Sequence, residues 1–299
     1  MITLPDGSTL TLTPTLGQFD ATHKFPGHVP QTKTLVYDTP SGVATVSVGV
    51  AYAPTPPNPP PTPTPVTEWI TPGTGKPAMS DAAAAALVGV APENIPGNAA
   101  ANAYVPPPAE LAAYQAGGQW NPLTKYVTGT PGLAPGGGPW STDMLIQWAS
   151  LKWGIPTDWM RAEMWQESQW GQSGGADHGL GDAATVSAQS YTEYPVQARI
   201  QPYQVYQSMG ISQVKWDPTT NNLPGQGAEP LRWKSTAFNL DLQHAYLRMY
   251  YDGLSYLGPG TKGQEWDAVG DWFEPSSNGS GGAGYVANVQ AVLAAKPWL

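Results

Sequence analysis

Residues 155–171, IPTDWMRAEMWQESQWG, carry the strongest helix signal in the chain, together with three tryptophans and an acid set among apolar neighbours. Thr157 is expected to cap this helix and Gly171 to end it. On a helix Glu167 shares a face with Trp170, three residues further on. A carboxylate held against apolar surface is destabilising unless it has a partner or a chemical role. Glu167 is therefore the first candidate for a functional residue.

The composition excludes several classes of protein. The 299 residues carry a formal net charge of −9 at pH 7 and a pI of about 4.7, whereas nucleic-acid-binding proteins usually have a basic surface. The N-terminus has neither a basic segment nor an apolar core, so we expect no signal peptide. The longest run of small apolar residues, 82–91, is too short to span a membrane, which needs about 20 residues. With four scattered histidines and no cysteine, we expect no metal and no other cofactor.

The distribution of proline and tryptophan divides the chain into four segments. Residues 1–53 alternate threonine with valine or leucine around two turns, which predicts two β-hairpins in a β-rich N-terminal segment. Residues 54–66 are a polyproline linker, a semi-rigid spacer. Residues 67–139 predict an extended, partly helical connector that packs on its neighbours. Of 33 prolines, 24 precede Trp140, whereas 11 of 13 tryptophans lie at or after it, so a compact domain is expected at 140–299.

Serine caps and glycine or proline stops predict the helices. The expected N-caps are Ser80, Ser141 and Ser235. The segment between the helices of the compact domain, 172–234, is expected to be rich in loops. The predicted helices are 80–91 and 108–117 in the connector, then 142–153, 158–170, 236–252 and 284–296 in the compact domain.

Four motifs in this order resemble the lysozyme-like lytic transglycosylase family, and most closely an actinobacterial and actinophage branch of it. They are the dipeptide Glu167-Ser168 after an apolar run, a turn at Gly210-Ile211-Ser212-Gln213, an Ala- and Leu-rich helix in STAFNLDLQHAYLRMYYDG, and a last helix beginning GYVANVQAVL. The resemblance covers about half of the chain. It implies a mainly α, lysozyme-like domain that cleaves the β-1,4 bond between N-acetylmuramic acid and N-acetylglucosamine in bacterial peptidoglycan.

The resemblance also implies roles for single residues. Glu167 would act as acid and then as base, while the 6-hydroxyl of the muramic acid attacks its own anomeric carbon and forms a 1,6-anhydro product. Ordinary glycosidases need a second carboxylate, for which Asp177, Asp182 and Glu193 are the candidates if the reaction is hydrolysis. The residues expected at the substrate are Ser168, Trp170, Gly210, Ile211, Ser212, Gln213 and Tyr246.

Two departures from the family pattern leave questions open. Ser212 stands where the family has a large apolar residue. The late Tyr-Asn-Ala-Gly motif is replaced by Gly270-Asp271-Trp272-Phe273, so the tyrosine that helps to position the acid is unassigned. Its candidates are Tyr246, Tyr250, Tyr251 and Tyr285. The candidates for stacking on sugar rings are Trp170, Trp216 and Trp272.

The expected substrate lies outside the cytoplasm, yet no signal peptide is expected. A phage protein carried in the virion, on the tail or its tip, reconciles the two, because it meets the cell wall during DNA delivery. The strand edges of 1–53 would then dock onto other tail proteins, and peptidoglycan would be the second partner. Two alternatives stay open: a non-catalytic tail protein that binds wall glycan, and a hydrolytic endolysin released at lysis.

Overall fold

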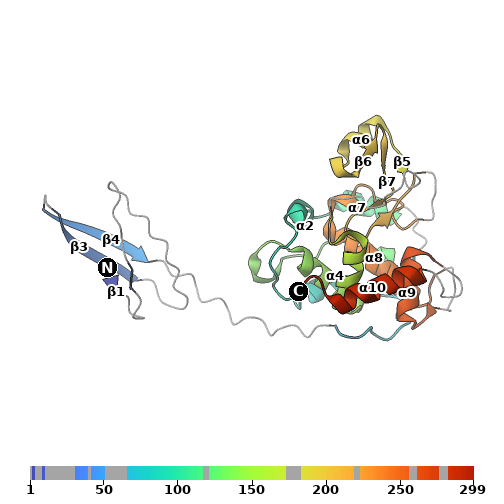
Figure 1. Ribbon diagram of the computed structural model, residues 1–299, viewed down its shortest axis with the longest axis horizontal. Coiled ribbons are helices and arrows are strands. Elements are labelled where there is room, and N and C mark those ends of the chain that lie inside the picture. Colours follow the sequence, from blue (N-terminus) through green and yellow to red (C-terminus); the bar gives the residue numbers. More distant parts are fainter. Residues whose placement is uncertain are drawn as a thin grey trace. The chain divides into compact units, whose positions relative to one another are not determined.

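The computed structural model divides the chain into two compact units, residues 1–62 and 63–299, each of which is described by itself (Figure 1). The structure describes residues 66–116, 121–172, 183–218, 223–255, 261–275 and 282–299, and the backbone of four strands before them. In chain order the elements are β1 (Ile2–Thr3), β2 (Thr9–Leu10), β3 (Gln31–Thr39), β4 (Gly42–Val50), α1 (Asp81–Ala85), α2 (Ala99–Asn102), α3 (Pro108–Ala116), α4 (Thr142–Trp153), α5 (Thr157–Ser168), β5 (Ala183–Thr185), α6 (Ala188–Glu193), β6 (Arg199–Gln201), β7 (Gln204–Tyr206), β8 (Ser208–Met209), β9 (Val214–Lys215), α7 (Leu231–Lys234), α8 (Thr236–Tyr251), α9 (Glu265–Phe273) and α10 (Ala283–Ala295).

The described strands of the first unit form two antiparallel hairpins. β1 pairs with β2, and β3 pairs with β4 along nine residues of each strand. Thr39 lies opposite Gly42 at one end of this ladder. The polyproline residues 54–65 lie outside the described part of the chain.

The second unit is mainly helical, as predicted, and α8 is its central helix. All 16 residues of α8 are buried. It packs against α4, α7 and α9, and α10 in turn packs against α5 and α9. Figure 1 shows α9 and α10 together at one end of this unit. The side chains of Ser80, Ser141 and Ser235 each accept a backbone amide at the start of α1, α4 and α8, which confirms the three predicted caps.

Helix α5 differs from the prediction at both ends. Pro156, not Thr157, occupies the N-cap position, and no side chain caps the helix. Thr157 is instead the first helical residue, and its amide donates to the carbonyl of Val66 at 3.2 Å. The helix ends at Ser168, before Gly171, because Gln169 takes the left-handed conformation with φ 51°. The predicted cap and stop were therefore both wrong.

Residues 66–139 belong to the same compact unit as the helices. Trp69 and Tyr114 lie in its main hydrophobic core. The buried carboxylate of Asp241 on α8 accepts the backbone amide of Thr128 at 2.8 Å, so the segment is also attached through its backbone. It packs on its neighbours as predicted, but the compact unit begins at residue 63 and the change in composition at residue 140 is not its boundary.

A small lobe interrupts the helices between α5 and α7. Its sheet has the antiparallel order β5–β7–β6, with α6 beside it, at the top of the helical unit in Figure 1. Ala184, Tyr194 and Val205 form the centre of a second, smaller hydrophobic cluster there. The hairpin β8–β9 follows, with Met209 opposite Val214, and residues 210–213 form the turn between its strands.

Candidate active site

Glu167 lies in the last turn of α5, on the side that faces α9 and α10. The helix ends one residue later because the left-handed Gln169 returns its amide to the carbonyl of Trp165 at 2.9 Å. Glu167 is half-buried. The carboxyl lies at the C-terminal end of α5, which is the negative end of the helix dipole.

Two donors from different helices bind the same oxygen of Glu167. The hydroxyl of Tyr285 on α10 donates to Oε1 at 2.5 Å, and the indole Nε1 of Trp272 on α9 donates to it at 3.1 Å. Burial first, and then Glu167, raise the pKa of Tyr285 well above its usual range, so its hydroxyl keeps its proton. Of the four tyrosines that the sequence left open, the structure brings Tyr285 to the acid.

Packing fixes both donors in place. The ring of Phe273 stacks on Tyr285 with centroids 4.9 Å apart and an angle of 8° between the planes. Tyr246 meets Trp272 edge-on at 6.0 Å. The carboxyl of Glu167 is therefore held by side chains that are themselves restrained, which is the arrangement that defines the orientation of a reacting group.

Glu163, one turn before Glu167, is a second and wholly buried carboxyl. Gln243 Nε2 donates to its Oε1 at 2.9 Å. Burial first, and then the charge of Glu167, raise the pKa of Glu163 well above its usual range, which favours the neutral acid. Glu163 Oε2 and Gln243 Oε1 are both buried without a partner. The burial, the Gln243 bond and the raised pKa together favour a structural role for Glu163 as a neutral acid.

The turn at residues 210–213 lies against the end of α5. Ser168 Oγ donates to the carbonyl of Ile211 at 2.7 Å. The residue next to Glu167 therefore attaches the turn to the end of α5. Gly210 has φ 85°, and a Cβ there would lie 2.1 Å from the side-chain nitrogen of Asn239. Only glycine therefore fits this position. Contact of Ser168, Gly210 and Ile211 with a substrate stays a prediction.

The polar side chains of the turn point inward. Ser212 is wholly buried and its hydroxyl donates to the side-chain carbonyl of Asn239 at 2.5 Å. This bond explains how a polar residue is accommodated in place of the family's apolar one. Gln213 is 8% exposed and its Nε2 donates to the carbonyl of Gly210 at 2.7 Å. Both side chains hold the turn, and their contact with a substrate stays a prediction.

Trp170 and Tyr246 are core residues in this structure. Trp170 is 1% exposed and its Nε1 donates to the carbonyl of Arg161 at 2.9 Å. Tyr246 is wholly buried. Neither ring offers a surface to a ligand, so the structure gives no support to direct substrate contact by these two residues. Tyr246 packs against the ring of Trp272.

The candidates for a second carboxylate do not meet Glu167 in the described structure. Glu193 is exposed on α6, where it lines a pocket that does not include Glu167. Asp177 and Asp182 lie outside the described residues. Trp272 donates to the acid, and its stacking on a sugar ring stays a prediction. Gln243 was missed because nothing in the local sequence marks a partner 80 residues from Glu163.

Within the ranges that the structure describes, no three His, Cys, Asp or Glu side chains are grouped so that they could hold a metal ion. None of the helices in those ranges is both long and apolar enough to cross a bilayer. Comparisons of the chain with protein-family models, curated proteins and solved structures found no match.

Proposed function

We propose that the chain is a lytic transglycosylase that cleaves the β-1,4 bond between N-acetylmuramic acid and N-acetylglucosamine in bacterial peptidoglycan. The setting of Glu167 carries the proposal: a half-buried carboxyl at a helix end, with Tyr285 and Trp272 both donating to one of its oxygens. The bond from Ser168 to the 210–213 turn supports it, because it joins two of the family-like motifs at this carboxyl.

In the first step the acid form of Glu167 gives its proton to the glycosidic oxygen, while the bond between that oxygen and the anomeric carbon breaks. In the second step the 6-hydroxyl of the same sugar attacks this carbon, and its proton passes back to Glu167. A 1,6-anhydro ring forms, no water is consumed and the enzyme is restored. The two donors on Oε1 keep the carboxyl in one orientation through both proton transfers.

A single ionisable carboxyl suits this reaction. The neighbouring Glu163 is wholly buried and favours its neutral form, so it does not provide the nucleophile that a retaining glycosidase needs. The attacking group comes from the substrate in place of a second carboxylate or an activated water.

Digestion of purified peptidoglycan, followed by mass spectrometry of the soluble products, tests the proposal. We expect anhydro-muropeptides, each lighter by one water than the hydrolytic product, and we expect Glu167→Gln to abolish their release. Glu193→Gln is the matched control, because it makes the same change in an exposed acid of the small lobe and should leave cleavage intact.

The other outcomes separate the competing functions. Reducing-end products would identify a hydrolase, and their loss in Glu193→Gln would name the second carboxylate. Intact glycan that still binds the wild-type chain would identify a non-catalytic glycan-binding protein and overturn the proposal.

We also propose that the chain is carried on a phage tail, with the first unit docked on other virion proteins. The supporting observation is the division into two compact units at the proline-rich segment. A variant that lacks residues 1–62 should cleave peptidoglycan like the full chain but be missing from purified virions. If the full chain is itself missing from virions, this placement is wrong.

A further inference from the structure

A pocket lies between the small lobe and α7. Its volume is about 450 Å³, within the range of roughly 300–1,000 Å³ that is typical of small-molecule sites. Its walls come from β5, α6, the segment after β9 and the start of α7. Neither Tyr285 nor Trp272 lines it, so it is distinct from the contacts that hold Glu167.

Glu229 is the polar centre of this pocket. Trp233 Nε1 donates to its Oε2 at 2.7 Å, and Arg232 Nε donates to its Oε1. Arg232 is wholly buried, so it offsets the charge of the carboxylate and holds it in place. The Tyr194 hydroxyl also bonds to Glu229. A carboxylate accepts about four hydrogen bonds, so these three donors leave room for a hydroxyl group of a ligand.

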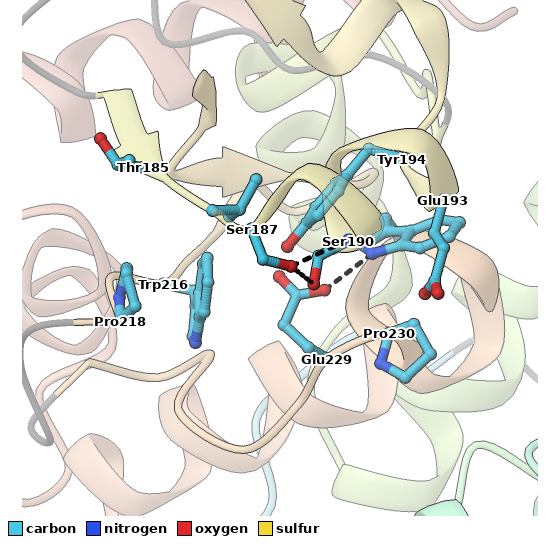
Figure 2. Close-up of a pocket in the computed structure, with 11 residues that line it drawn as sticks. Thr185, Ser187, Ser190, Glu193, Tyr194, Trp216, Pro218, Glu229 and Pro230 are labelled. Carbon is cyan, nitrogen blue, oxygen red and sulfur yellow. Dashed lines mark hydrogen bonds between the residues drawn. The ribbon is translucent and has the colours of Figure 1, made fainter. Parts of the chain in front are cut away.

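Hydroxyl groups surround the carboxylate. Figure 2 shows Ser187 and Ser190 close to Glu229, with the two serine oxygens 2.8 Å apart and bonded to each other. The Tyr194 hydroxyl points to the same place in Figure 2. Burial first, and then Glu229, raise the pKa of Tyr194, so this hydroxyl keeps its proton and remains a donor. The pocket therefore offers both donors and acceptors at one point.

Aromatic rings supply the apolar walls. Trp216 stands at one side of the pocket in Figure 2 and is half-buried. The guanidinium of Arg232 lies 5.4 Å from its ring centre, which restrains the indole. Tyr194 and Trp233 pack on each other with centroids 5.4 Å apart. A flat apolar wall next to a cluster of hydrogen-bonding groups matches a pyranose ring, which has an apolar face and a rim of hydroxyls.

We propose that this pocket binds a neutral saccharide, with one ring stacked on Trp216 and its hydroxyls on Glu229 and the two serines. The described lining residues include no lysine or arginine, so the pocket does not favour an anion. Arg232 already offsets Glu229, so an amine gains little there. The site goes beyond the proposed cleavage reaction and does not depend on it.

Titration with chitotriose, a neutral saccharide, tests the proposal in the full chain carrying Glu167→Gln. The indole N–H signals are followed by NMR, and Trp216→Phe and Trp272→Phe assign the two signals of interest. We expect the Trp216 signal to shift to saturation. Glu229→Gln should weaken this binding at least about tenfold, because a hydrogen bond to a charged group becomes a neutral one.

Glu68→Gln is the matched control, because it makes the same change in an exposed acid that does not line the pocket. It should leave the affinity unchanged. Thermal unfolding checks that each variant is folded, and Ser190→Ala replaces Glu229→Gln if the latter does not fold, with a weaker affinity expected.

Three results would overturn the proposal. The Trp216 signal could stay unmoved while that of Trp272 shifts, which would confine the saccharide to the Glu167 site. Butylamine could shift the Trp216 signal at a lower concentration than chitotriose does. Alternatively, Glu193→Gln could weaken chitotriose binding as much as Glu229→Gln does. Either result would identify a site for cations. Peptidoglycan cleavage by the wild-type chain is measured separately, so a failure of the proposed function leaves this result interpretable.

Discussion

Replacing Tyr285 with phenylalanine removes one oxygen atom from the candidate active site. The lost hydroxyl is the donor 2.5 Å from Glu167 Oε1, whereas the ring keeps its stacking on Phe273. A hydrogen bond to a charged group contributes about 1.5–3 kcal/mol, and each 1.36 kcal/mol is about tenfold in rate. Because Trp272 still donates to the acid, we expect kcat on peptidoglycan to fall about 10- to 150-fold without being abolished.

The assay for this prediction separates orientation of the acid from substrate binding and from folding. The rate of muropeptide release is measured over a range of peptidoglycan concentrations, and urea unfolding is measured in parallel. Tyr285 is 7% exposed and acts through Glu167, so KM should change by less than about twofold. Tyr114→Phe, in a buried tyrosine of α3 that packs on Phe238, is the control. An unchanged kcat would refute the role of the hydroxyl, and a rise in KM alone would place it on the substrate.

Two further predictions concern buried titratable groups. The raised pKa of Glu163 means that its contribution to stability is present below pH 4.5 and is lost as the pH rises through its value in the fold. In urea titrations the free energy of unfolding of Glu163→Gln should therefore rise relative to that of the wild type as the pH rises. A difference between the two proteins that stays constant with pH would contradict this. Burial lowers the pKa of His244 from 6.5 to about 4. A contribution of about 3 kcal/mol to the free energy of unfolding, present above pH 6.5, is therefore lost as the pH falls toward 4. His244→Asn keeps a donor for the carbonyl of Leu240 and should not show this fall in stability at low pH. An equal fall in both proteins would refute the role of His244.

The helices that the sequence predicted best are those whose ends depend on a single local residue. Ser141 accepts the amide of Met144, and Gly154 ends α4 in the left-handed conformation with φ 66°. The end of α5 depends on tertiary packing instead. Trp170 follows the last turn with φ 67°, donates to Arg161 and stacks on the ring of Trp298. A residue nearly at the C-terminus of the chain thus helps to decide where α5 stops, and no local pattern contains that information.

The candidate site also depends partly on local sequence and partly on distant packing. Glu167 was found from its own helix, but its donors lie 105 and 118 residues further along the chain. Four tyrosines were equal candidates because their distance in sequence says nothing about which one faces the acid. The packing of α10 against both α5 and α9 selects Tyr285. Tyr246, Tyr250 and Tyr251 lie on α8 and are buried.

The polar residues of α8 link the N-terminal part of the compact unit to the acid. A charged residue such as Asp241 normally indicates a solvated face, yet here it is buried. Lys152 contacts it at 2.7 Å, and the amide of Thr128 donates to it. Two residues further on, Gln243 binds the neutral Glu163 below Glu167. A chain that began at residue 140, where the composition changes, would lack Thr128, so the carboxylate of Asp241 would lose this donor. The loss would weaken α8, the helix that supports Glu163. The setting of Glu167 therefore depends on the segment before residue 140, although none of the four motifs lies there.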